Sequence, residues 1–209
     1  EDLREFKSQH PGVPVVCYVN STADVKAESD ICCTSANAVK IVKSLNAPKV
    51  LFIPDSGLGS YVNSQLPDTE VISYPGYCPT HMRIKPSDID NLKSQYPEAM
   101  VLVHPECHME VINKADFVGS TSGIIKTAKE SDKKQFIIAT EKGVVDRLKR
   151  DLPEKEFILV SEKAICENMK WNTLEDILIS LQRLAPEVDV PRETASKAFT
   201  SIKRMLDVK

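Results

Sequence analysis

The sequence predicts an α/β protein made of two copies of one unit, each a three-layer αβα arrangement with a parallel sheet. Short apolar runs alternate with amphipathic stretches along the 209 residues, which is the order typical of parallel sheets covered by helices. The chain also aligns with itself without a gap: residues 1–74 pair with residues 87–160, and 15 of these 74 pairs are identical. Ordinary composition would give roughly 5 identities by chance.

Each expected strand is a short apolar run bounded by polar or turn residues. We expect strands at residues 14–19, 50–53, 70–73, 101–104, 136–139 and 157–160. We expect helices between them at residues 3–9, 36–45, 86–95 and 143–151. Apolar residues at helical spacing predict two more helices, at residues 173–184 and 192–206. The expected organisation is a first unit at 1–77, a second unit at 78–170 and a helical tail at 171–209.

The composition is that of an ordinary globular protein, with 42% hydrophobic and 27% charged residues. A net charge of -3 without a long basic run argues against a protein that binds nucleic acid or a membrane surface. No apolar stretch approaches the length of a membrane span, and no signal-peptide pattern begins the chain. We therefore expect the cytoplasm as the compartment. Because the first residue is Glu1 and not Met, we expect a fragment or a processed product.

Two of the six cysteines occupy related places in the two copies. Cys78 and Cys166 are 88 residues apart, so a two-residue insertion in the second copy superposes them. Such a pair of thiols predicts a metal or cluster held between the units; two unrelated thiols are the alternative. His81 follows Cys78 by three residues but has no counterpart in the second copy. Cys17, Cys32 and Cys33 are expected to be buried in apolar segments. Cys107 adjoins Glu106 and is expected to line the site.

Polar residues follow the first strand of each copy at matching positions. Tyr18 and Asn20 align with His104 and Glu106. Ligands bind at the carboxyl ends of parallel strands, and these four side chains offer hydrogen-bonding and proton-transfer groups. The alternative is that neighbouring loops satisfy these side chains and they bind nothing.

Hydroxyl residues stand at the expected helix starts, Thr34-Ser35 in the first copy and Ser120-Thr121 in the second. Such residues are ordinary helix caps. The same geometry, however, aims free backbone N–H groups at a ligand beyond the strand ends, which suits a carboxylate or phosphate.

Several short motifs occur in the order found in quinolinate synthases. These are Tyr18-Val19-Asn20-Ser21-Thr22, Thr34-Ser35-Ala36-Asn37-Ala38, Cys78-Pro79-Thr80-His81, His104-Pro105-Glu106-Cys107, Gly119-Ser120-Thr121, residues 166–170 and Asn172-Thr173-Leu174-Glu175. From about residue 2 to the end, the chain resembles this family. The resemblance implies three α/β repeats around a pseudo-threefold axis, of which this chain carries two.

The resemblance also implies a [4Fe–4S] cluster with one cysteine from each repeat. Cys78 and Cys166 would be two of the ligands, and the third is expected from a segment absent from this chain. Met169 would pack against the cluster. Some family members carry a Cys-x-x-Cys motif near the last ligand, and residues 166–169 lack it.

The implied activity is the condensation of iminoaspartate with dihydroxyacetone phosphate to quinolinate, the pyridine precursor of NAD, with an open iron as Lewis acid. L-aspartate oxidase or dehydrogenase would be the upstream enzyme, and no nucleic acid or membrane partner is expected. The implied catalytic residues are Tyr18, His104 and Glu106. Substrate would be bound by Tyr18, Asn20, Ser35, His104, Glu106 and Thr121. Alone, this fragment is expected to be inactive.

Three alternatives belong to other classes. One is an α/β binding module in which both cysteines are structural. Another is a zinc hydrolase, which would need Cys78, His81, His104 and Cys166 to converge. The last is a phosphosugar-binding protein that uses the two helix N-termini without catalysis.

Overall fold

The structure is a computed structural model and describes residues 1–208. Its first part contains α1 (Asp2–Ser8), β1 (Val15–Tyr18), α2 (Ala23–Ala27), β2 (Ile31–Cys33), α3 (Ala38–Ser44), β3 (Lys49–Ile53), α4 (Ser56–Gln65) and β4 (Glu70–Ser73). The second contains α5 (Pro79–Met82), α6 (Pro86–Gln95), β5 (Met100–Val103), α7 (Met109–Ile112), β6 (Phe117–Val118), α8 (Thr121–Glu130), β7 (Gln135–Ala139), α9 (Lys142–Asp151) and β8 (Glu156–Leu159). A 3-10 turn (Asn168–Lys170), α10 (Leu174–Arg183) and α11 (Arg192–Asp207) follow.

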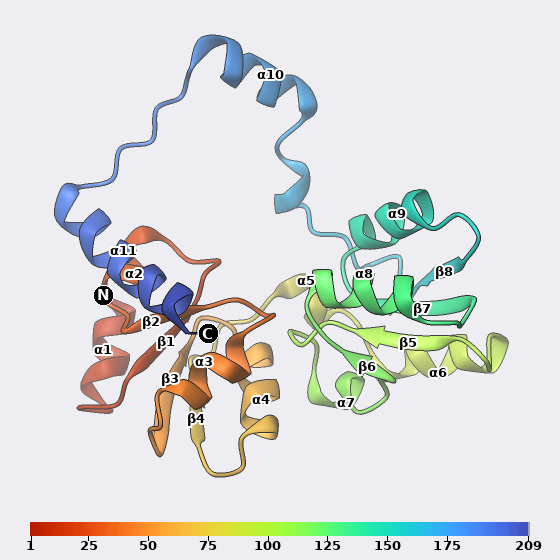
Figure 1. Cartoon of the computed structure of the whole chain (residues 1–209), viewed down its shortest axis with the longest axis horizontal. Helices are drawn as coiled ribbons and strands as arrows, with labels where there is room; N and C mark the ends of the chain where they lie inside the picture. Colours follow the sequence, from red (N-terminus) through yellow and green to blue (C-terminus); the bar gives the residue numbers. More distant parts are fainter. Residues whose placement is uncertain (209) are drawn as a thin grey trace.

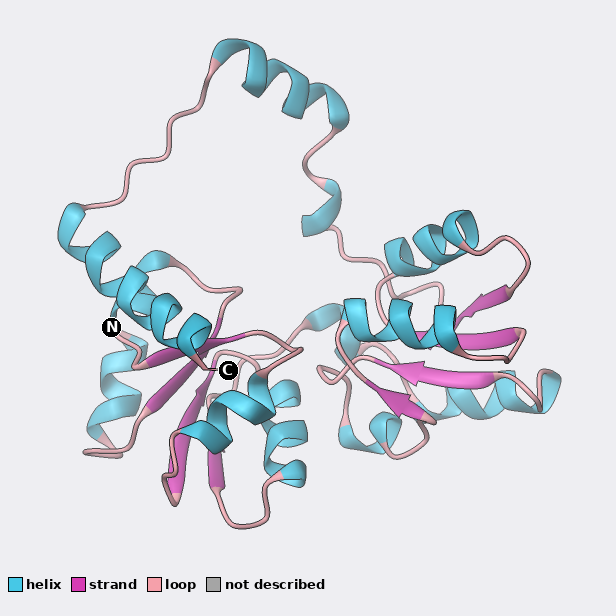
Figure 2. Ribbon diagram, in the orientation of Figure 1, coloured by secondary structure: helices cyan, strands magenta, loops and turns pink. Residues whose placement is uncertain are grey.

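The two parts have the same topology. The first sheet has the strand order β2-β1-β3-β4 and the second has β6-β5-β7-β8, and all of these pairs are parallel. The two sheets lie in two lobes side by side, and helices cover both faces of each sheet (Figures 1 and 2). The α/β fold and the duplication expected from the sequence are therefore confirmed.

The duplication extends to single hydrogen bonds. Asp30 and Asp116 are paired by the self-alignment, and each carboxylate accepts a hydrogen bond from the first part of a central strand. The donors are the backbone N–H groups of Val15 and Val101, and both distances are 2.7 Å. The same local interaction thus fixes the start of β1 and of β5.

The central strands consist almost entirely of apolar residues because helices cover both faces of each sheet. In the first sheet, residues such as Val16, Leu51 and Phe52 are fully buried. In the second, Phe136 on β7 and Phe157 on β8 stack with ring centroids 5.4 Å apart. Burial of these side chains is the main stabilising contribution to each lobe.

Two strands were not expected from the sequence. β2 and β6 contain three and two residues, too few to establish a period-2 pattern. They form because each pairs in parallel with the central strand of its sheet, as Cys17 does with Cys32. The apolar segment around Cys32 is therefore an edge strand.

The start of α3 also differs from the expectation. The helix begins at Ala38, with Asn37 at the N-cap position. Thr34 and Ser35 therefore precede the helix and do not cap it. The Asn37 side chain accepts a hydrogen bond from the Thr34 backbone N–H at 2.6 Å, so the segment before Ala38 is held in a turn and the helix begins two residues later than expected.

The C-terminal helices connect the lobes. α10 forms an arch between them (Figure 1), and its Leu174, Leu178 and Leu181 side chains are exposed. α11 then packs on α2 and β2 of the first lobe, where the buried Ser201 hydroxyl donates to the Lys26 carbonyl at 3.0 Å.

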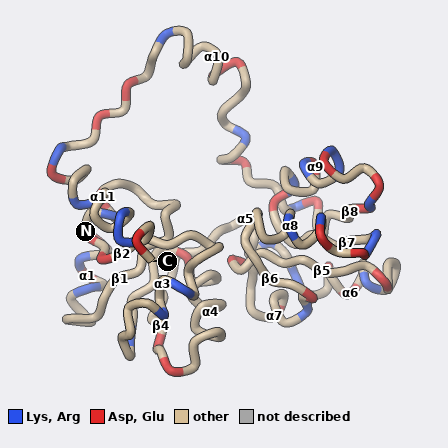
Figure 3. Tube along the Cα trace, viewed as in Figure 1, with Lys and Arg blue, Asp and Glu red and all other residues tan. Residues whose placement is uncertain are grey.

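Charged residues of both signs are interspersed over the two lobes (Figure 3). Within residues 1–208, no helix combines the length and apolar character needed to cross a bilayer.

Candidate active site

A cavity of about 440 Å³ lies where the carboxyl ends of the two sheets meet. Its lining includes Tyr18, Asn20, Cys78, Glu106 and Cys166, so five of the side chains selected from the sequence share one space. The others that line it are Pro54, Asp55, Gly76, Tyr77, Thr80, His81, Glu141 and Met169.

The two cysteine loops are built in the same way. In the first lobe, the N–H of Ser56, at the start of α4, donates to the Gly76 carbonyl at 2.8 Å. In the second lobe, the N–H of Lys142, at the start of α9, donates to the Ala164 carbonyl at 2.9 Å. Each carbonyl lies two residues before its cysteine, which supports the two-residue insertion expected from the sequence.

The six cysteines are all free thiols. Cys78 and Cys166 are half-buried, whereas Cys17, Cys32, Cys33 and Cys107 are fully buried. Cys78 and Cys166 are also the two cysteines that line the 440 Å³ cavity.

His81 is the centre of the polar network, although from the sequence it was considered only as a metal ligand and not among the catalytic residues of the implied enzyme. Its Nδ1 lies 3.2 Å from the Cys78 Sγ and 2.9 Å from the Glu106 Oε2. Its Nε2 lies 2.9 Å from the Thr140 hydroxyl. The one available signal was the Cys78-x-x-His81 spacing, which places Cys78 at the N-cap and His81 in the single turn of α5, close enough for their side chains to meet.

The surroundings of His81 keep it protonated. Burial alone would lower the pKa of His81, but the hydrogen bonds to Cys78 and Glu106 outweigh this and raise it to about 9. Burial would raise the pKa of the Cys78 thiol, but the hydrogen bond from His81 gives a net lowering. Cys78 is thereby favoured as a thiolate, the form that binds metal.

Glu106 and His104 titrate in different ways. Burial would raise the pKa of Glu106, but the hydrogen bond from His81 and attraction to the imidazoles place it below its ordinary value. Burial, together with the nearby His81 charge, lowers the pKa of His104 to about 4. The two imidazoles stack with centroids 4.6 Å apart. At neutral pH the site therefore contains an ionised carboxylate beside one charged and one neutral imidazole.

Tyr18 lies at the end of β1 in the first lobe and lines the same cavity as His81 and Glu106. Burial raises the pKa of Tyr18, and the charge of Glu106 raises it further, whereas the Ser35 hydroxyl acts in the opposite direction. The phenol therefore stays protonated at neutral pH and lies within the influence of Glu106.

Comparison with known proteins identifies the family. The profile of the family described as "Quinolinate synthetase A protein" matches residues 1–207. The chain is 50% identical to the quinolinate synthase of Alkaliphilus metalliredigens over 209 residues, which are 100% of the chain and 69% of that protein. It is 55% identical to the quinolinate synthase of Dehalococcoides mccartyi over 207 residues, which are 99% of the chain and 68% of that protein. The chain belongs to the quinolinate synthase family.

Quinolinate synthases are enzymes of NAD biosynthesis and use an iron–sulfur cluster. The donor set of this chain fits such a group, because two thiols from equivalent loops line one cavity and iron–sulfur clusters are held by cysteine thiolates. The ligand atoms of Cys78, His81 and Glu106 also lie within 4.8 Å of one another. Neither His104 nor Cys166 belongs to this group, so residues 1–208 do not form the four-residue zinc site considered above.

Ser35 and Thr121 lie apart from the cysteines. Ser35 lines a second cavity of about 420 Å³ together with Ser120 and Lys126. Ser120 caps α8, where its hydroxyl accepts from the Gly123 N–H at 3.2 Å. Thr121 is the first residue of α8, is exposed and lines neither cavity. In this part of the quinolinate synthase fold, Ser120 and Ser122 are the hydroxyl residues of the second copy that share a cavity with Ser35.

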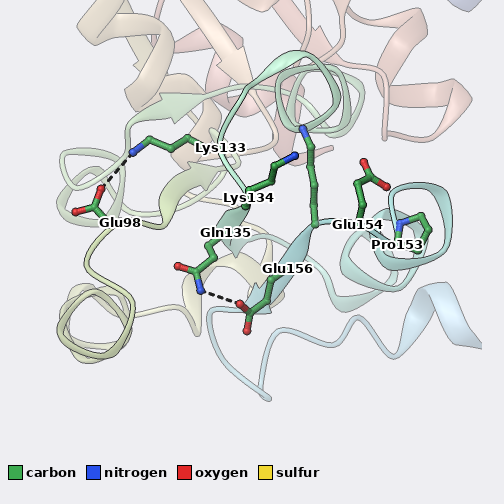
Figure 4. Close-up of a pocket in the computed structure, with 8 residues that line it drawn as sticks. Glu98, Lys133, Lys134, Gln135, Pro153, Glu154 and Glu156 are labelled. Atoms are coloured by element: carbon green, nitrogen blue, oxygen red, sulfur yellow. Dashed lines mark hydrogen bonds and ion pairs between the residues drawn. The ribbon is translucent and has the colours of Figure 1, made fainter.

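A third cavity lies at the opposite end of the second sheet, where β7 and β8 begin (Figure 4). It has a volume of about 510 Å³. Lys133 pairs with Glu98 at 3.5 Å, and the Gln135 amide donates to Glu156 at 2.8 Å. The Lys155 ammonium donates to the carbonyls of Ala128 and Ser131, both at 2.7 Å, and the cavity contains none of the residues selected from the motifs.

Gly57 at the start of α4 contacts the loop that carries Glu106. A Cβ at this position would collide with the Glu106 carbonyl oxygen and lie 2.9 Å from its carbon. We expect Gly57→Ala to reduce the free energy of unfolding by about 1–3 kcal/mol, because neither backbone can yield. Denaturant unfolding measures the effect. Gly123→Ala in α8 is the matched control, since the added methyl group meets nothing closer than 3.4 Å. Equal stability of the two variants would show that this helix and loop are not in contact.

Proposed function

We propose that this chain provides two of three cluster ligands and the acid–base groups of a quinolinate synthase. The reaction is the condensation of iminoaspartate with dihydroxyacetone phosphate, which releases phosphate and water. One observation carries the proposal: two cysteines from equivalent loops of a duplicated fold line the same cavity as Tyr18, His81 and Glu106.

The cluster is a [4Fe–4S] centre held by Cys78, Cys166 and a cysteine outside residues 1–209. The burial of the other four thiols supports an outside ligand, because none of them lines the cavity. When bound, a cluster with three thiolate ligands supplies a Lewis-acidic iron that polarises a leaving hydroxyl group.

Glu106 is the proton acceptor. It is buried, its lowered pKa keeps it ionised at neutral pH, and a positioned carboxylate suits the isomerisation and dehydration steps. His81, protonated beside this carboxylate, donates its own proton to the leaving oxygen and is reprotonated by the proton that Glu106 has taken from the substrate. His104, neutral and stacked on His81, accepts a hydrogen bond from the Glu106 backbone N–H at 3.4 Å. It thereby positions the backbone that carries the carboxylate, and it shares proton transfer.

The remaining polar residues bind substrate. Tyr18 and Asn20 line the cavity beside Glu106, and they orient the substrate through hydrogen bonds. Ser35, which lines the second cavity with Ser120, binds a carboxylate or the phosphate. Thr121, expected from the sequence to share this role, lines neither cavity and is not assigned a substrate contact. These substrates are small metabolites, iminoaspartate comes from an L-aspartate oxidase or dehydrogenase, and the reaction takes place in the cytoplasm.

The test is the formation of quinolinate from freshly generated iminoaspartate and dihydroxyacetone phosphate. The full-length protein that contains this chain is purified without oxygen, and the product is measured by chromatography with mass detection. We expect turnover by the full-length protein and none by residues 1–209 alone, which lack one ligand. A cluster-loaded protein that binds phosphate but forms no quinolinate would contradict the proposal and favour the binding module.

A further inference from the structure

Each cysteine loop is attached to the preceding helix by one buried carboxylate. Asp55 is the N-cap of α4: its Oδ1 accepts from the Leu58 N–H at 2.7 Å, and its Oδ2 accepts from the Cys78 N–H at 2.8 Å. Glu141 is the N-cap of α9: its Oε2 accepts from the Gly143 N–H at 2.6 Å, and its Oε1 accepts from the Cys166 N–H at 3.4 Å.

The two carboxylates occupy equivalent positions, since the self-alignment pairs residue 55 with residue 141. They are also deeply buried, with 4% of Asp55 and 6% of Glu141 exposed. Helix capping alone needs one oxygen, which Ser, Thr or Asn would supply without a buried charge. In both copies the second oxygen goes to the backbone of the cysteine.

The second copy has an additional attachment. Lys170, at the end of the turn that follows Cys166, forms an ion pair with the Glu141 Oε1 at 3.2 Å. Glu141 therefore holds this segment at the cysteine and again four residues beyond it. This second contact accompanies the longer Cys166 hydrogen bond.

We propose that Asp55 and Glu141 are positioning residues that fix the Cys78 and Cys166 thiolates for the cluster. Fixing the N–H of a cysteine fixes its Cα–Cβ direction, and partners behind a ligand of this kind control how firmly a metal group is held. The inference rests on the proposed function, because it takes these two cysteines as the cluster ligands. It adds two residues that act through the backbone of the cysteines.

The variants Asp55→Asn and Glu141→Gln separate this role from capping. Each keeps the shape of the side chain but has one acceptor oxygen in place of two, so either the cap or the cysteine contact is lost. Asp116→Asn is the matched control. Its carboxylate also accepts a backbone N–H, from Val101 at 2.7 Å, but at the opposite end of the second sheet.

The first measurement uses the cluster-loaded full-length protein. An iron chelator is added without oxygen, and cluster loss is followed by visible absorbance. We expect Asp55→Asn and Glu141→Gln to lose the cluster on the order of tenfold faster than the wild type, and Asp116→Asn to match the wild type. Wild-type rates in both variants would overturn the inference.

The second measurement uses iron-free protein and is independent of the cluster. Alkylation by iodoacetamide is followed for each cysteine by peptide mass spectrometry. We expect Asp55→Asn to accelerate the reaction several-fold at Cys78 only, and Glu141→Gln at Cys166 only, since each loop loses its own hydrogen bond. Equal acceleration at both cysteines would indicate a general loss of stability and overturn the inference. Site-specific acceleration in a protein that never holds iron would refute the proposed function and leave the positioning role intact.

Discussion

Glu106→Gln is expected to reduce kcat for quinolinate formation by roughly 10²–10⁴, the usual contribution of a positioned acid–base group. The amide keeps the shape of the side chain but cannot take a proton. The substitution also removes the negative charge of the carboxylate, whose Oε2 lies 2.9 Å from the His81 Nδ1. Steady-state kinetics on the full-length enzyme measure this effect, together with a visible spectrum to show that the cluster is retained.

Glu110→Gln is the matched control for this prediction. Glu110 lies four residues further along, in α7, and is exposed, so the same chemical change there should leave kcat within a factor of about two. Normal turnover by Glu106→Gln with an intact cluster would exclude Glu106 as the proton acceptor. A matching loss in both variants would instead indicate a general effect of charge removal.

Cys78→Ser and Cys166→Ser are each expected to abolish stable cluster binding and, with it, activity. A hydroxyl group is not deprotonated at neutral pH and is a much poorer ligand for iron than a thiolate. Visible absorbance and iron content of full-length protein, purified without oxygen, measure the effect. The loss should be nearly complete because three thiolates are the whole ligand set that the proposal allows.

Cys33→Ala tests whether any cysteine replacement has this effect. Cys33 is fully buried in β2, away from the cavity, so this variant should keep its cluster and lose some stability only. A cluster that survives in Cys78→Ser or Cys166→Ser would remove that residue from the ligand set.

The sequence was sufficient to predict the parts of the fold that depend on local pattern and on repetition. The 70–73 strand and the 86–95 helix have the expected bounds, because an apolar run and an amphipathic period each extend over a whole element. The self-alignment also placed the two cysteine loops correctly relative to each other. The duplication made this possible, because the two copies use the same backbone hydrogen bonds at equivalent positions.

The sequence could not predict features that arise from contact between distant segments. β6 has two residues and exists because it pairs with β5. His81 has no counterpart in the second copy, and its importance appears only when the fold brings Glu106 and Thr140 to its ring. The different placement of Ser120 and Thr121 depends on the rotation of one helix start, which residue type does not reveal.

The most direct test of the central claim is the iron and acid-labile sulfide content of anaerobically purified protein. It should be measured for residues 1–209 and for a form extended upstream through the next cysteine. The proposal predicts about four iron and four sulfide per extended chain, with less in the shorter form. An extended protein without iron would contradict the cluster assignment and, with it, the catalytic role assigned to this cavity.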